Sequence, residues 1–199
     1  KNPLSKTGLA ISHLAQGDKT RGIAELELAS DMSDSAVQAD LALVMTYLRE
    51  RNYDKALAAV NDLEKKQPTS VLAANLRGSV LTAKGDVAGA RKAFENALER
   101  DPKFFPAAAN LASLDLREKK YDSAKKRYTA FLDKDPKNVR AMLALAQIAQ
   151  GTAVVERAER RAADLKAGKT PPAPAPLANK EALEWLKKAR DADPNSVPA

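Results

Sequence analysis

The chain of 199 residues is 44% hydrophobic but only 5% aromatic, and its formal net charge is +7. Alanine supplies much of the apolar share, as in proteins built from short, closely packed helices. The absence of cysteine excludes disulfides and thiolate metal sites. No stretch approaches the roughly 18 to 20 apolar residues that a membrane span needs.

A period of 34 residues runs through most of the chain and is marked by Pro68, Pro102 and Pro136. Small or compact residues keep the same period in two columns: Val44, Gly78 and Ala112; Ala56, Ala90 and Ala124. This pattern resembles the tetratricopeptide repeat, in which each unit is a hairpin of two antiparallel helices. One hairpin cannot bury its apolar face alone. We therefore expect an all-α solenoid, a right-handed superhelix with a concave inner surface.

In chain order, five units are expected in a single array, at residues 3–36, 37–70, 71–104, 105–138 and 139–196. The turns within the first three hairpins are placed at Gly17-Asp18, Arg51-Asn52 and Gly85-Asp86. Pro106 falls in the first turn of the fourth unit's first helix, where a missing N–H costs nothing.

The fifth unit is split by an insertion at about residues 151–178, because Ala182 follows Ala149 by 33 residues instead of nine. Apolar residues keep helical spacing within the insertion: Val154, Val155, Ala158, Ala162 and Leu165. We expect the helix to continue to about Gly168, followed by an extended, proline-rich return over residues 169–177. The insertion is either an arm that touches a partner or membrane surface, or a tolerated hairpin insertion, which we favour.

Three stretches of the later repeats carry a more specific likeness: DPKFFPAAANLASLDL (residues 101–116), AKKRY (124–128) and DPKNVRAMLALA (135–146). They resemble the tetratricopeptide-repeat lipoprotein of the PEP-CTERM/exosortase sorting system of Gram-negative bacteria. The resemblance implies a lipid-anchored protein of the cell envelope, in the periplasm or at the outer membrane, linked to exopolysaccharide and protein sorting. The insertion and the missing anchor depart from that family. We read the chain as a piece of a longer array, which would meet a membrane only through an anchor outside this sequence.

Most of the excess positive charge lies between Arg117 and Arg140. These residues are expected on the outer face, without interleaved aromatic rings on which bases could stack, so nucleic acid is not an expected partner. The single histidine, His13, has no second histidine with which to share a metal. We expect no enzymatic activity, no metal and no cofactor.

The candidate binding residues are those at the inward columns of the first helices, which line the groove of such arrays. They are Gln38, Leu41, Met45, Arg49, Leu72, Asn75, Ser79, Ala109, Ser113, Arg117, Arg140, Leu143 and Gln147. Amides and hydroxyls in this set suit a peptide backbone, and its three arginines, expected near one rim, suit an acidic segment. Alternatively, these residues only keep the concave face soluble.

Two functions are compatible with this pattern. The preferred one is a scaffold that holds an extended peptide or a partner protein in the groove. The alternative is a structural spacer within a larger envelope assembly. An apolar edge around Leu183, Trp185 and Leu186 further predicts weak self-association through the terminal helices.

Overall fold

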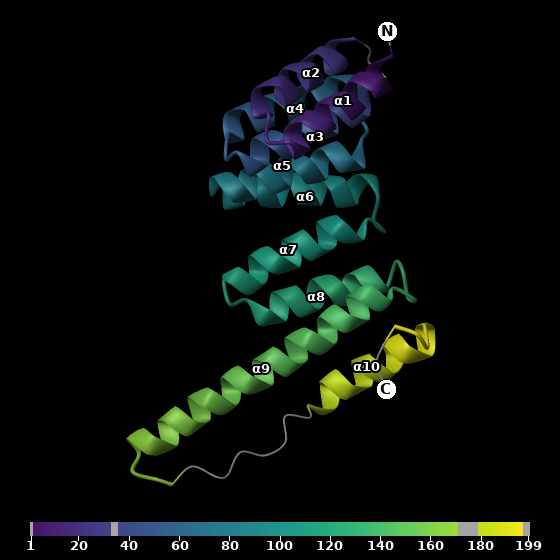
Figure 1. Ribbon diagram of the computed structural model, residues 1–199. Coiled ribbons are helices and arrows are strands. Elements are labelled where there is room, and N and C mark those ends of the chain that lie inside the picture. Colours follow the sequence, from purple (N-terminus) through teal and green to yellow (C-terminus); the bar gives the residue numbers. More distant parts are fainter. Residues whose placement is uncertain (1, 33–35, 171–178, 197–199) are drawn as a thin grey trace. The chain divides into compact units, whose positions relative to one another are not determined.

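The computed structural model describes residues 2–32, 36–170 and 179–196, which form helices joined by short turns (Figure 1). The helices of this described part are α1 (Pro3–Ala15), α2 (Lys19–Asp31), α3 (Val37–Arg49), α4 (Tyr53–Lys66), α5 (Val71–Lys84), α6 (Val87–Arg100), α7 (Phe105–Arg117), α8 (Tyr121–Leu132), α9 (Val139–Lys166) and α10 (Lys180–Ala192). The predicted all-α class is confirmed, and the turns fall where the repeat pattern placed them.

The chain divides into two compact units, residues 1–107 (unit 1) and 108–199 (unit 2), and the division falls in the first turn of α7. Unit 1 holds three hairpins in two layers, because α1, α3 and α5 contact one another in turn while α2 and α4 each contact the first helices on both sides. We call α1, α3 and α5 the first-helix layer. The path of a single array through both units stays a prediction.

The turn inside each of the first four hairpins has one residue in the left-handed region, at positions 34 apart: Gly17 (φ 85°), Arg51 (φ 57°), Gly85 (φ 92°) and Lys119 (φ 59°). The next residue caps the following helix in three of the four hairpins. The side chains of Asp18, Asn52 and Asp86 each accept a hydrogen bond from the backbone N–H three residues later. The turn between the two helices of a hairpin is therefore determined by residues within the turn itself.

Small residues hold the two helices of a hairpin close together. A Cβ added at Gly78 would lie 2.5 Å from the Phe94 ring, and one added at Gly22 would lie 2.6 Å from the Leu14 side chain. Ala90, in the second small column, is completely buried. The larger residue on one helix thus fills the space that glycine leaves on its neighbour.

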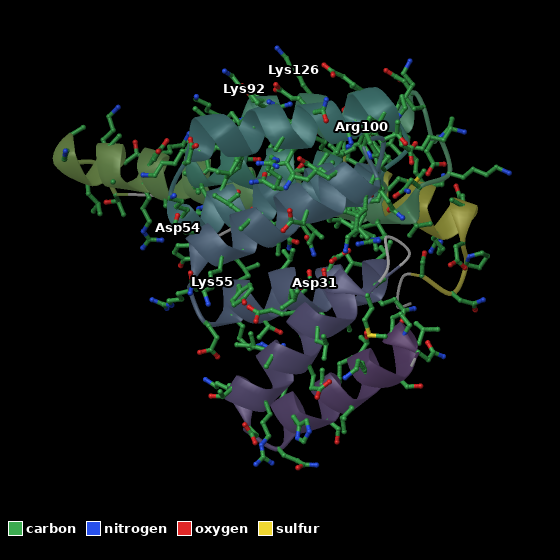
Figure 2. All side chains as sticks on the ribbon, turned by 90° about the horizontal axis from the view of Figure 1, so that it is seen from above. Asp31, Asp54, Lys55, Lys92, Arg100 and Lys126 are labelled. Atoms are coloured by element: carbon green, nitrogen blue, oxygen red, sulfur yellow. The ribbon has the colours of Figure 1, made fainter. Side chains whose placement is uncertain are left out.

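Replacement of Gly78 by leucine is expected to lower the free energy of unfolding by about 1 to 3 kcal/mol, because the side chain must displace the Phe94 ring. Ala90→Leu should have a similar effect. Lys92→Leu is the control, since Lys92 lies on the same helix as Phe94 but extends into solvent (Figure 2). Urea denaturation measures all three, and equal stabilities would show that the assigned repeat register is wrong.

A buried ion pair links three helices of unit 1. Asp40 on α3 is 1% exposed, and the Lys66 Nζ on α4 lies 3.0 and 3.1 Å from its two carboxylate oxygens. The same ammonium donates to the backbone oxygen of Ser30, at the end of α2, at 2.9 Å. The Ser30 hydroxyl in turn donates to Asp40. All three polar groups are therefore satisfied away from water.

Lys66→Met is expected to cost about 3 to 5 kcal/mol of folding free energy, because it leaves the Asp40 carboxylate buried without its cation. Lys65→Met is the matched control, since Lys65 has a 77% exposed side chain and, among the described residues, pairs with Asp62 of its own helix. A second replacement, Asp40→Leu, should restore part of the stability lost in Lys66→Met. Equal losses from the two single lysine variants, measured by denaturant titration, would contradict a role for the pair in holding α2, α3 and α4 together.

In unit 2, α9 has 28 residues and continues into the insertion as expected. It ends at Lys166, just before Gly168 (φ 68°). All of its buried residues lie between Ala141 and Ala149, and α10 packs against this first half (Figure 1). No side chain from residue 150 to residue 166 is buried in the described structure. Most of the proline-rich return, residues 171–177, lies outside the described residues.

Candidate functional site

The first-helix layer of unit 1 presents large apolar side chains to solvent. Leu4 and Ile11 on α1 are 59% and 52% exposed, Met45 on α3 is 51% exposed, and Leu72 on α5 is 41% exposed. They occupy two columns of the repeat, because Leu4 and Leu72 are 68 residues apart and Ile11 and Met45 are 34 apart. Large apolar side chains that are exposed on three stacked helices are typical of a binding surface. We call this surface the first-helix face.

Within α1, α3 and α5, this face has no exposed carboxylate. The sequences of α1, α3 and α5 contain one acidic residue, Asp40, which is buried and paired with Lys66. Acidic residues of the second helices hold two cations of the layer, since Lys6 pairs with Glu25 and Arg77 with Glu64. Arg49 is exposed at the end of α3. The charge of the face is therefore neutral to positive around apolar side chains.

The predicted residues of unit 1 differ in accessibility. Gln38, Met45, Arg49 and Leu72 are exposed, whereas Leu41 and Ser79 are half-buried. Asn75 is only 8% exposed, and the Ser79 hydroxyl donates to its backbone oxygen at 3.1 Å. The expectation that Asn75 and Ser79 together present polar groups to a ligand does not hold, because Asn75 is buried.

Leu4 and Ile11 were absent from the predicted set, although both share its columns. The repeat register contained the necessary signal, since Leu4 stands in the column of Gln38 and Leu72, and Ile11 in that of Met45 and Ser79. The first repeat matches the pattern least well.

In unit 2, Ser113, Arg117, Arg140 and Gln147 are exposed, while Ala109 and Leu143 are half-buried. Arg117 is the last residue of α7 and Arg140 is the second residue of α9. The chain reverses between α7 and α8 and again before α9 (Figure 1), so these two arginines lie at opposite ends of their parallel helices. They do not form one rim, contrary to the expectation.

Some residues of the basic stretch in unit 2 form ion pairs with other helices instead of being only solvated. The Lys125 Nζ lies 2.8 Å from a Glu181 carboxylate oxygen on α10, and Arg127 binds the buried Asp115 of α7. These cations connect helices. Lys126, in contrast, is exposed and extends away from α8 (Figure 2).

Two buried tyrosines have a raised pKa. Burial, the hydrogen bond to Glu27 and the charge of that carboxylate together raise the pKa of Tyr47 above its usual range. Burial raises the pKa of Tyr128, and the charge of Arg140 partly offsets this shift. In both cases the neutral phenol is favoured, so these groups act as hydrogen-bonding and packing elements near neutral pH.

The described residues contain no group of three or more potential metal ligands. His13 is half-buried on α1. None of the described helices has the length and apolar character needed to cross a membrane.

Comparison with known protein families identifies helical repeats in the same part of the chain. Residues 3–104 match the family described as tetratricopeptide repeat-like domain, and residues 109–169 match the tetratricopeptide repeat. A search of curated proteins found no match.

Several solved structures are similar. MamA is 17% identical, with 93% of this chain and 94% of that chain covered and a TM-score of 0.59. PilW, a type IV pilus biogenesis factor, is 20% identical over 96% of this chain and 77% of its own, with a TM-score of 0.58. YrrB, described as having an unusual peptide-binding site, is 17% identical over 96% and 86%, with a TM-score of 0.51.

At these identities the likeness concerns the fold. Family membership rests on the repeat matches, the first of which covers about half of the chain. Tetratricopeptide repeats generally mediate protein–protein interactions. The repeat matches, the 34-residue columns and the hairpins together establish that this chain belongs to the tetratricopeptide repeat family.

Proposed function

We propose that this chain is a protein-interaction scaffold of the bacterial cell envelope, in the periplasm or at the outer membrane, linked to exopolysaccharide and PEP-CTERM protein sorting. The envelope assignment is supported by the resemblance of residues 101–116, 124–128 and 135–146 to the exosortase-associated lipoprotein. The interaction role is supported by the repeat family. The partner is an extended segment of another protein.

The observation that carries the proposal is the first-helix face of unit 1. Its exposed leucine, isoleucine and methionine side chains would be removed from water by a partner, which is the dominant favourable term in association. The absence of an exposed carboxylate, together with Arg49, favours a segment with apolar anchors and acidic or neutral flanks. The expectation of a mainly polar, acidic peptide is thereby changed to one with apolar anchors.

Replacement of both Met45 and Leu72 by serine is expected to reduce partner capture by about fivefold or more, because each removes an apolar contact from the face. Affinity capture from an envelope extract, quantified by mass spectrometry against the unmodified chain, measures this. Leu28→Ser is the matched control, since Leu28 is 48% exposed but lies on α2, a second helix. Melting temperatures should be unchanged for both variants.

The alternative function, a structural spacer without a ligand on this face, makes a different prediction. In that case the same proteins would be captured in equal amounts by the unmodified chain, the Met45/Leu72 double variant and Leu28→Ser.

Weak self-association through α10 belongs to the same proposal. Trp185 and Leu186 pack against Ala146, Ala149 and Ala182, whereas Leu183 is 54% exposed. The exposed apolar surface of α10 is therefore smaller than the sequence predicted. If the chain self-associates, its sedimentation coefficient should increase with protein concentration, and Leu183→Lys should remove that increase. An unmodified chain that sediments as a monomer at all concentrations would contradict self-association.

A further inference from the structure

Two adjoining hollows lie in unit 2 between α9 and the start of α8. The first, of about 320 Å³, is lined mainly by Leu116, Tyr121, Tyr128 and Ile148, with Gly151 at its border. The second, of about 460 Å³, shares Tyr121 and Thr152 with the first. We call the two together the arm cleft. Their volumes and the mixture of aromatic and polar walls are typical of ligand sites.

The second hollow exists because α9 continues beyond residue 151 into the insertion. One wall is formed by Thr152, Val155, Glu156 and Glu159, which lie at helical spacings of three, four and seven residues and so share one face of α9. A first helix of normal length would end near residue 151 and would provide none of them. The insertion therefore builds a surface that an ordinary repeat lacks.

In the arm cleft, fewer of the carboxylates than of the lysines form ion pairs within the described residues. Among the described residues, Asp122, Glu156 and Glu159 form no ion pair, whereas Lys120 on the opposite wall is held by Glu118 at 2.7 Å. Lys119 is the one lysine of the walls outside an ion pair in this part of the chain. The arginines of α9 beyond residue 150, which are Arg157, Arg160 and Arg161, are not part of the lining. Unpaired carboxylates thus exceed unpaired cations, which favours a basic group beside the apolar hollow.

We propose that the arm cleft is a second binding site, separate from the first-helix face, for a segment of a partner protein. An aromatic or large aliphatic side chain of that segment fills the hollow beside Tyr121 and Tyr128. A neighbouring lysine or arginine pairs with Glu156 and Glu159. The first contact supplies apolar burial and the second selects the sequence next to it.

The test uses the whole chain and a random-peptide display library as the probe. Selected peptides should share an aromatic or large aliphatic residue close to a lysine or arginine. Gly151→Leu should weaken their binding about tenfold or more, because leucine fills the first hollow. The variant should keep its fold, since a Cβ at Gly151 meets no atom within 4 Å and leucine favours helix over glycine. A melting temperature that is unchanged or higher verifies this.

Glu156→Gln with Glu159→Gln should reduce affinity severalfold and flatten its dependence on salt, because the shape of the wall is kept and its charge removed. Arg160→Gln with Arg161→Gln is the matched control on the same arm and should not weaken binding. Selection of no peptide, of acidic peptides, or of peptides insensitive to Gly151→Leu would overturn the proposal. Peptides that lose binding only in the Met45/Leu72 double variant would assign the ligand to the first-helix face, so the two proposals fail separately.

Discussion

The close approach of the two helices in each hairpin is the contact on which this structure depends. At Gly78 the ring of Phe94 occupies the space in which any other residue would place its Cβ. Completely buried alanines such as Ala90 and Ala124 continue the same contact along the second helices. Because a protein interior tolerates neither a void nor an overlap of this size, the size of these residues fixes the register of one helix on the other. The exposed faces of the helices then follow from that register.

Charge is distributed unequally between the two layers of unit 1. The one carboxylate of the first helices, Asp40, points inward and is neutralised by Lys66. The remaining carboxylates of the hairpins lie on the second helices and in the turns, where they pair with residues such as Lys6 and Arg77. Within α1, α3 and α5, the exposed apolar side chains are therefore not accompanied by an exposed carboxylate, so desolvation of such a group would not oppose the proposed binding.

The insertion changes one repeat without disturbing its packing. The first half of α9 buries its apolar residues against α8 and α10 in the manner of an ordinary first helix, and Asn179 returns the chain by donating to the Ala149 backbone oxygen at 2.8 Å. The second half extends past this point as an uninterrupted helix. Its residues Thr152, Val155, Glu156 and Glu159 then face the start of α8 and form the wall of the arm cleft. A lengthened helix can thus add a surface at little cost to the core, because the added turns satisfy their own backbone hydrogen bonds.

The sequence alone determined the local features of the chain. The small columns, the turns at residues 17, 51 and 85, and the continuation of α9 into the insertion all follow from spacing and residue type, because each depends on contacts within one hairpin or one helix. Tertiary packing decided the rest. Asn75 was predicted as an accessible amide but is covered, Lys125 was predicted as solvated but pairs with Glu181 from 56 residues away, and Arg117 and Arg140 were predicted on one rim but lie at opposite helix ends. Periodicity gives the face of a helix on which a residue lies. What covers that face, and which distant charge reaches it, depends on the neighbouring helices in three dimensions.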